Sequence, residues 1–208
     1  MAQDKIKAVI FDLGNVLVNF DHRRAARRIA PFTDKTPEEI YGLFFDSPLT
    51  AMFEEGKIAP SSFFLQVKEM LGLRLGYEDF VAAFNDIFFL TEENKGVHRL
   101  AESFSSRYQV ALLSNINILH WQYLRKSLSV FSHFQKILTS FELGVRKPDA
   151  MIYQKAFHAL GVKPQEVFYT DDRPELIAGA SRLGMRAAVF NGLASLKKAL
   201  SDNGLTLN

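Results

Sequence analysis

Five short apolar segments recur along the chain, with stretches of helical periodicity between them. They lie at residues 8–11, 110–113, 136–139, 167–170 and 187–190, and they are rich in apolar and β-branched side chains. Nearly continuous apolar runs of this length are typical of strands that are buried on both faces, and four of the five follow a helical stretch. The pattern predicts an α/β fold whose core is a Rossmann-like, doubly wound parallel sheet.

The interval between the first and second predicted strands is much longer than the others. Residues 12–109 lie between these strands, whereas the later intervals have the length of single crossovers. Residues 21–91 indicate one helix after another, with cap and turn signals between them. We therefore expect a core formed by residues 1–20 and 92–208, with a small all-α cap inserted as residues 21–91.

Pairs of adjacent phenylalanines mark the predicted cap. They are Phe44-Phe45, Phe63-Phe64 and Phe88-Phe89. Their spacing among polar residues is typical of the core-facing side of small helices, so we expect most of them to form the interior of the cap. The alternative is that some line a substrate pocket.

Composition excludes several classes of protein. The chain has 25 basic and 23 acidic residues and one short basic cluster at residues 23–28, whereas nucleic-acid-binding proteins usually carry a longer basic stripe. No cysteine is present, which excludes thiolate chemistry. No apolar run approaches the roughly 20 residues of a membrane helix, and residues 1–7 do not resemble a signal peptide. We expect a cytoplasmic protein without nucleic-acid or membrane partners, and its oligomeric state stays open.

Polar residues follow the inner predicted strands, and in open α/β sheets ligands bind at this edge. The residues with suitable chemistry are Asp12, Gly14, Ser114, Asn115, Lys147, Asp171 and Asp172. Because the carboxyl ends of parallel strands meet at one edge of a sheet, we expect these residues to lie close together.

These side chains suit magnesium and phosphate. Mg²⁺ prefers oxygen ligands and is usually held by one or two carboxylates, while a lysine and a serine hydroxyl can bind phosphate oxygens. Three crowded carboxylates would raise one another's pKa values unless a cation is present. With two carboxylates at the metal, Asp12 is left for in-line attack on phosphorus, which gives an acyl-phosphate that water hydrolyses.

Four segments stand in order along the chain: VIFDLGNVLVNFD, LLSN, GVRKPD and VFYTDDRPELIAGA. They resemble the four motifs of the haloacid dehalogenase-like superfamily over the whole predicted core. The chain is most similar to the phosphatases with a small helical cap, such as α-D-glucose-1-phosphate phosphatases and the N-terminal phosphatase domain of soluble epoxide hydrolases. The resemblance implies a Mg²⁺-dependent phosphoric monoester hydrolase that acts on a small phosphorylated metabolite such as a sugar phosphate.

The resemblance also implies a role for each motif residue. Asp12 is expected to be the nucleophile and a metal ligand, and Lys147 to bridge the nucleophile and the phosphate. The remaining roles are phosphate binding by Ser114 and Asn115, and metal binding by the backbone carbonyl of Gly14 and by Asp171 and Asp172.

One motif position departs from the common family pattern. Many members have a second aspartate two residues after the nucleophile, where it protonates the leaving group, and this chain has Gly14 there. General acid catalysis typically contributes about 10²- to 10⁴-fold to the rate. We therefore expect weaker activity on esters with poor leaving groups, unless another group replaces the acid.

Simpler structural roles exist for several of these residues. Ser114-Asn115 and Asp171-Asp172 are residue types that cap helices, so each pair is a candidate cap. Most of the five histidines are expected to be surface or core residues. His22 is the exception, because it lies where the cap begins and is placed to face the substrate.

Two other functions are compatible with the same residues. A metal-independent haloacid dehalogenase also uses an aspartate nucleophile, but its relatives usually lack acidic residues at the positions of Asp171 and Asp172. A regulatory protein that binds a phosphorylated metabolite without efficient turnover would explain Gly14.

Overall fold

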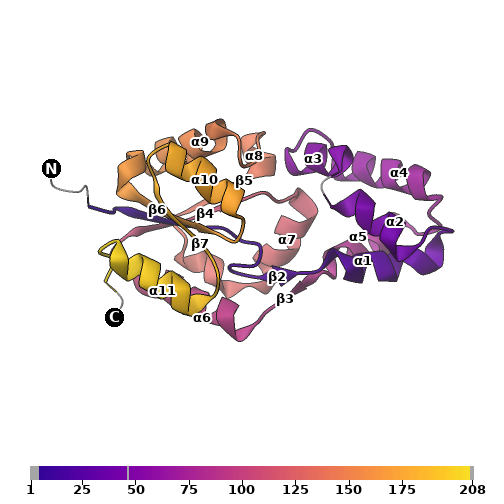
Figure 1. The fold of residues 1–208 in the computed structure, drawn as a ribbon. Helices are drawn as coiled ribbons and strands as arrows, with labels where there is room; N and C mark the ends of the chain where they lie inside the picture. The colour runs from indigo at the N-terminus through magenta and orange to yellow at the C-terminus, as the bar shows by residue number, and fades with distance from the viewer. Residues whose placement is uncertain (1–4, 46, 207–208) are drawn as a thin grey trace.

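The computed structural model describes residues 5–45 and 47–206. A five-stranded parallel sheet has the order β5-β4-β1-β6-β7 (Figure 1). Its strands are β1 (Ala8–Phe11), β4 (Gln109–Ser114), β5 (Lys136–Thr139), β6 (Val167–Asp171) and β7 (Arg186–Val189). The chain runs outward from β1 in one direction and then crosses to β6 on the other side. The expectation of a doubly wound α/β sheet is therefore confirmed.

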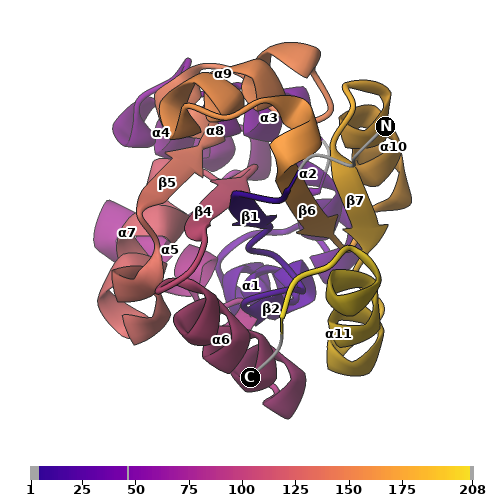
Figure 2. The ribbon, with the colours of Figure 1, turned by 90° about the vertical axis from the view of Figure 1, so that its left-hand side faces the viewer.

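Helices cover both faces of the sheet (Figure 2). One face carries α6 (Glu92–Phe104), α7 (Ile118–Ser127) and α11 (Leu193–Asp202), and the other carries α9 (Ala150–Leu160) and α10 (Pro174–Arg182). Along β1, Val9 and Phe11 enter the first core, whereas Ala8 and Ile10 enter the second. Burial on both faces explains why this segment is apolar without alternation.

Five of the α-helices between β1 and β4 pack together, and we call them the helical insertion. They are α1 (His22–Ile29), α2 (Pro37–Phe44), α3 (Pro48–Glu54), α4 (Pro60–Leu71) and α5 (Tyr77–Asn85). They enclose a separate core in which the rings of Phe53 and Phe63 stack with their centroids 4.2 Å apart. Among the described residues, no helix is both apolar enough and long enough to cross a membrane.

The phenylalanine pairs have mixed environments. Phe63 and Phe64 are buried in the core of the helical insertion, as expected, but Phe45 and Phe89 are 55% and 40% exposed. The side chain of Phe44 lies outside the described part of the structure. The expectation that these rings form the interior of the insertion is therefore confirmed for Phe63 and Phe64 and wrong for Phe45 and Phe89.

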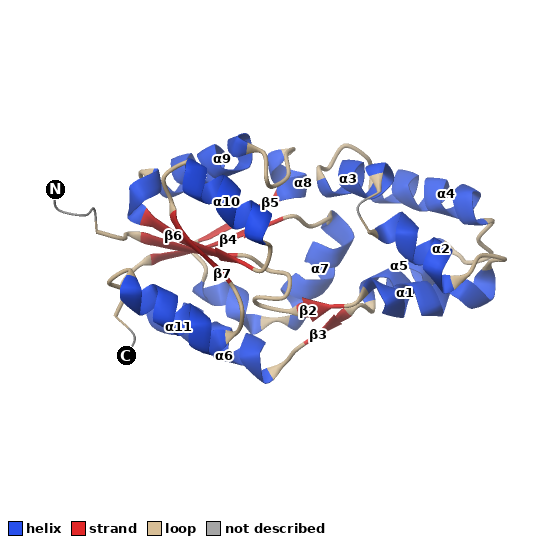
Figure 3. Ribbon diagram, in the orientation of Figure 1, coloured by secondary structure: helices blue, strands red, loops and turns tan. Residues whose placement is uncertain are grey.

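The helical insertion packs against α7, and two further connections join it to the rest of the fold (Figure 3). The first is an antiparallel ribbon of β2 (Asn19–Phe20) and β3 (Phe88–Phe89), which the sequence pattern does not reveal because two-residue strands are too short to show alternation. The second lies where α3 ends beside the short helix α8 (Ser140–Leu143). There the Ser140 hydroxyl donates to the carbonyl of Glu54 at 2.6 Å.

Close packing reinforces the second connection. A Cβ atom at Gly56 would lie 2.2 Å from the carbonyl oxygen of Phe141, so only glycine fits there. Its φ of +67° also favours glycine. The insertion is thus held from two sides over the carboxyl ends of the strands.

Candidate active site

The register of the central strands brings the first and fourth motifs together. Phe11 pairs with Thr170, and the N–H of Asp12 donates to the carbonyl of Thr170 at 2.9 Å. Asp12 therefore lies next to Asp171, which is the last residue of β6. Two carboxylates that are far apart in the sequence become neighbours because parallel strands end at one edge.

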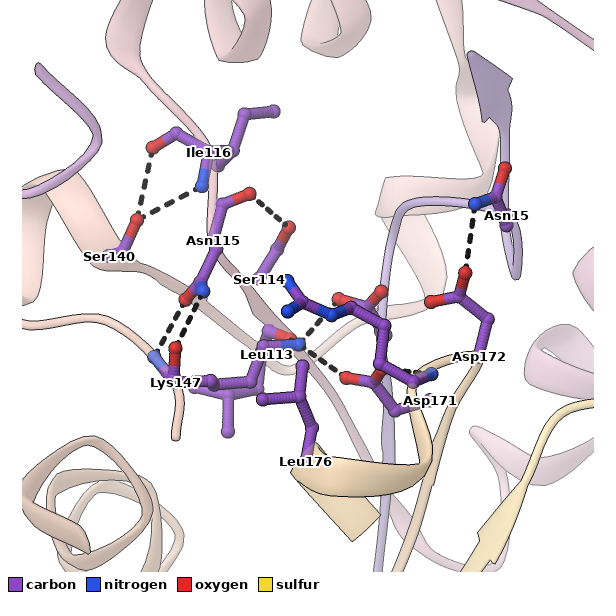
Figure 4. A network of polar contacts seen from close by, with 12 residues as sticks. Asn15, Leu113, Ser114, Asn115, Ile116, Ser140, Lys147, Asp171, Asp172 and Leu176 are labelled. Carbon is purple, nitrogen blue, oxygen red and sulfur yellow. Dashed lines mark hydrogen bonds and ion pairs between the residues drawn. The ribbon is translucent and has the colours of Figure 1, made fainter. Parts of the chain in front are cut away.

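Lys147 joins these two carboxylates. Its Nζ lies 2.7 Å from Asp12 Oδ1 and 2.6 Å from Asp171 Oδ2. It also lies 3.1 Å from the carbonyl of Leu113 and 3.0 Å from the hydroxyl of Tyr169, which itself donates to Asp171. Lys147 and Asp171 are 3% and 0% exposed. Figure 4 shows the Lys147 ammonium beside Leu113 and Asp171.

The three charged groups have different pKa shifts. Burial raises the pKa of Asp12 to about 7 against the opposing charge of Lys147, and the charge of Asp171 adds to the rise. Burial would also raise the pKa of Asp171, but Lys147 and the hydrogen bonds lower it overall. For Lys147, burial favours the neutral amine, yet the two carboxylates outweigh it and raise the pKa. Lys147 is paired with both carboxylates. Its positive charge outweighs the effect of burial on the pKa of Asp171 but not on the pKa of Asp12.

Asn115 fixes the loop that carries Lys147. Its Oδ1 accepts from the backbone N–H of Lys147 at 2.8 Å, and its Nδ2 donates to the Lys147 carbonyl at 2.9 Å (Figure 4). Ser114, the last residue of β4, is buried beside it. Asn117 caps α7, so the alternative that Ser114 and Asn115 cap this helix is wrong.

Asp172 adds a third carboxylate. Its Oδ2 accepts from Nδ2 of Asn15 at 2.8 Å, and burial raises its pKa. Asn15 has φ of +56°, a left-handed conformation that asparagine tolerates better than most residues. One carboxylate oxygen each from Asp12, Asp171 and Asp172 lies within 4.8 Å of the others. This oxygen-only donor set fits the preference of Mg²⁺.

The alternative that Asp171 and Asp172 cap the following helix is also wrong. Helix α10 begins at Pro174 with Arg173 at the cap position, and no side chain caps it. Asp171 accepts from the N–H of Arg173 at 3.0 Å, which helps to fix the turn.

A cavity of about 450 Å³ opens over the carboxylates, between the sheet and the helical insertion. All the predicted site residues line it except Asp171, which lies beneath it. His22, which we expected to face the substrate, lines it as well. The lining residues that the sequence analysis did not assign to the site are Asn15, Phe20, Phe45, Thr50, Glu54, Arg146, Arg173, Glu175 and Leu176.

The structure explains the glycine at position 14. A Cβ atom on Gly14 would lie 2.8 Å from Cε1 of Phe20, which is well inside van der Waals contact. The ring of Phe20 therefore occupies the space that a side chain at position 14 would need.

We predict that Gly14→Ala lowers the free energy of unfolding by about 1–3 kcal/mol because the new methyl group overlaps the ring. In a Phe20→Ala background the same change is expected to cost less than about 0.5 kcal/mol. Urea denaturation of the four proteins in this cycle measures both values. Equal costs in the two backgrounds would show that the ring does not restrict position 14.

A family model described as haloacid dehalogenase-like hydrolase matches residues 6–184. The chain is 24% identical over 185 residues to a D-ribitol-5-phosphate phosphatase from Bacteroides thetaiotaomicron, covering 86% of this chain and 89% of the relative. A drimenol cyclase from Aspergillus calidoustus is 23% identical over 95% of this chain. The chain spans about a third of the length of some of the curated relatives it matches, among them this cyclase, of which it covers 36%.

A solved structure also resembles this fold. A HAD family enzyme from Bacteroides thetaiotaomicron, in complex with magnesium and inorganic phosphate, has a TM-score of 0.78 and 27% sequence identity. The alignment covers 88% of this chain and 93% of that enzyme. From the family match over residues 6–184, together with the shared fold, it follows that the chain belongs to the haloacid dehalogenase-like hydrolase family.

Proposed function

We propose that the protein is a Mg²⁺-dependent phosphatase that hydrolyses a small phosphorylated metabolite through an aspartyl-phosphate on Asp12. One observation carries this proposal. Asp12 stands at the floor of an open cavity, 2.7 Å from Lys147 and within one cluster of three carboxylates. A buried carboxylate, a fixed ammonium and further oxygen ligands are components that phosphoryl transfer to an aspartate uses.

In this proposal the metal is held by the carboxylates of Asp12, Asp171 and Asp172 and by the carbonyl of Gly14. When bound, Mg²⁺ supplies positive charge beside the phosphate oxygens. The three carboxylates against one buried ammonium support this assignment, because a second cation would compensate the remaining negative charge. The related enzyme that was solved with magnesium and phosphate supports it further.

The protein's own residues perform the transfer. A carboxylate oxygen of Asp12 attacks phosphorus, and the electron pair of the breaking P–O bond goes to the ester oxygen. Lys147, which donates to Asp12, is placed to neutralise a phosphate oxygen as well. Ser114 is proposed to hold the phosphoryl group with its hydroxyl. Water then attacks the acyl-phosphate and releases phosphate from Asp12.

For Asn115 we propose a phosphate contact through the N–H that the loop does not use. Its amide carries two N–H groups, and one donates to the carbonyl of Lys147. The side chain would thus link the position of Lys147 to the position of the phosphate.

The substrate is proposed to be compact. The cavity of about 450 Å³ has the size of a small-molecule site, and the helical insertion covers it. We assign residues 21–91 as the cap, which excludes water from the reacting groups, and residues 1–20 and 92–208 as the core. The ribitol phosphate phosphatase among the relatives supports a polyol or sugar phosphate.

We predict Mg²⁺-dependent release of p-nitrophenol from p-nitrophenyl phosphate, whose leaving group needs no protonation. Asp12→Asn is expected to lower this rate by at least about a thousandfold because it removes the nucleophile. The rate is measured with Mg²⁺ and after treatment with EDTA. Release that does not exceed the Asp12→Asn rate would refute the phosphatase and favour a binding protein. Full activity in EDTA would instead support the metal-independent hydrolase.

We also predict that Mg²⁺ binding becomes about tenfold tighter between pH 6 and pH 8. Without metal the pKa of Asp12 is raised to about 7, so below this pH a proton competes with the cation, and above it the carboxylate is free to bind. The dissociation constant is measured by isothermal titration calorimetry. Asp12→Asn serves as the control, because it should bind more weakly and lose most of the pH dependence. An unchanged constant in the original protein across this range would contradict the proposed role of Asp12 as a ligand.

A further inference from the structure

The residues named so far include no hydrogen-bond donor for the leaving group. The leaving group must extend from the phosphate toward the helical insertion, and position 14 offers no side chain there because Phe20 fills the space. The alcohol that leaves a sugar or polyol phosphate is a poor leaving group, so its oxygen gains negative charge as the bond to phosphorus breaks. A hydrogen-bond donor near this oxygen would stabilise the transition state.

Most of the polar side chains on the insertion side of the cavity already have partners. The hydroxyl of Thr50 donates to the carbonyl of Leu43 at 3.0 Å. Glu54 Oε2 lies 3.1 Å from Nε of Arg146. On the core side, Arg173 pairs with Glu175. These groups are therefore less available to the leaving group.

His22 differs from them. Its imidazole makes no hydrogen bond to any side chain or backbone group of the described residues, and Nδ1 is buried. His120, whose ring centroid is 6.3 Å away, shows the contrast. Its two ring nitrogens contact Asn117 at 3.0 Å and the carbonyl of Phe84 at 3.1 Å, as a structural histidine should.

The position of His22 is fixed by packing. Its ring lies 5.1 Å from the ring of Phe20 and 6.4 Å from that of Phe45, measured between centroids. His22 also shares both the main cavity and a smaller one of about 70 Å³ with Gly14 and Phe20. The imidazole thus borders the same space as the missing aspartate, and it approaches from the insertion instead of the nucleophile loop.

We propose that His22 takes over the place of that aspartate: a ring N–H of His22 donates a hydrogen bond to the ester oxygen of the leaving group. This proposal rests on the phosphatase function proposed above. As the P–O bond breaks, its electron pair moves to the ester oxygen, the hydrogen bond from His22 stabilises the resulting alkoxide, and a water molecule supplies the proton of the alcohol product.

The protonation state of the His22 imidazole favours a hydrogen bond to the ester oxygen over full proton transfer. Burial lowers the pKa of His22 to about 4, against the smaller opposing effect of Asp21, so the ring is neutral near pH 7. A neutral imidazole keeps one N–H donor, and such a group can polarise an oxygen without giving up its proton. His22 is therefore a catalytic residue for poor leaving groups and matters less for good ones.

The test compares three variants at position 22. His22→Gln keeps an N–H donor at the cavity, whereas His22→Met removes it, and His22→Phe provides a second variant without a donor. Each is assayed with Mg²⁺ on p-nitrophenyl phosphate and on a panel of hexose and polyol phosphates. His158→Gln is the matched control, because His158 is exposed on α9, away from the lining of the cavity. Circular dichroism and the thermal midpoint establish that each variant is folded.

For His22→Met and His22→Phe we expect kcat on the best alkyl phosphate to fall at least about tenfold more than kcat on p-nitrophenyl phosphate. His22→Gln should recover part of this difference, and His158→Gln should show none. Equal losses on both kinds of substrate, or no loss in a folded variant, would overturn the role of His22 while the phosphatase function stands. An unchanged protein without Mg²⁺-dependent activity on either kind of substrate would overturn both proposals.

Discussion

One ammonium group shared between two buried carboxylates is the interaction on which the site depends. Lys147 lies between Asp12 and Asp171, and removing its charge would leave two carboxylates in a desolvated place. Further hydrogen bonds reduce the cost of burying these charges. The ammonium also donates to the carbonyl of Leu113 and to the hydroxyl of Tyr169, and this hydroxyl donates to Asp171. The same geometry leaves the charge of Asp12 less well compensated than that of Asp171, which supports the proposal that Asp12 binds a second cation.

The fold is arranged to maintain this contact. Strands β4, β1 and β6 are neighbours in the sheet, so their ends deliver Ser114, Asp12 and Asp171 to one edge. Lys147 comes from a loop instead of a strand, and loops are less well fixed. Asn115 compensates with two hydrogen bonds to the backbone of Lys147. An asparagine at the end of one strand thus positions the cation that follows the next strand.

Much of this site was predictable from the sequence because it depends on strand ends. Apolar runs locate the strands, and the polar residues that follow parallel strands must lie at one edge of the sheet. This reasoning brings Asp12, Ser114 and Asp171 together from the sequence alone. The β2–β3 ribbon was not predictable, because four residues show no period. The contact of Phe20 with Gly14 was not predictable either, since it depends on the position of the β2–β3 ribbon relative to the loop after β1. Likewise, no pattern indicates that Tyr169, in an apolar strand, contacts Lys147.

The residues that line the cavity on the side of the insertion were the least predictable from the sequence. Thr50 and Glu54 lie on α3 of the insertion, and they approach the site only because Ser140 and Gly56 hold the end of this helix against the core. Such contacts join residues about 85 positions apart and follow no local rule. The residues of the cavity wall are therefore placed by tertiary packing, whereas Asp12, Ser114 and Asp171 are placed by the order of the strands.

In the proposed mechanism Asp12 becomes phosphorylated during turnover, and trapping this acyl-phosphate tests the mechanism directly. The protein is quenched in acid while it hydrolyses p-nitrophenyl phosphate with Mg²⁺, and its peptides are examined by mass spectrometry with and without hydroxylamine, which cleaves acyl-phosphates. We predict a phosphoryl group on the peptide that contains Asp12, lost with hydroxylamine and absent from Asp12→Asn. A phosphoryl group on another residue would contradict the assignment of Asp12 as the nucleophile.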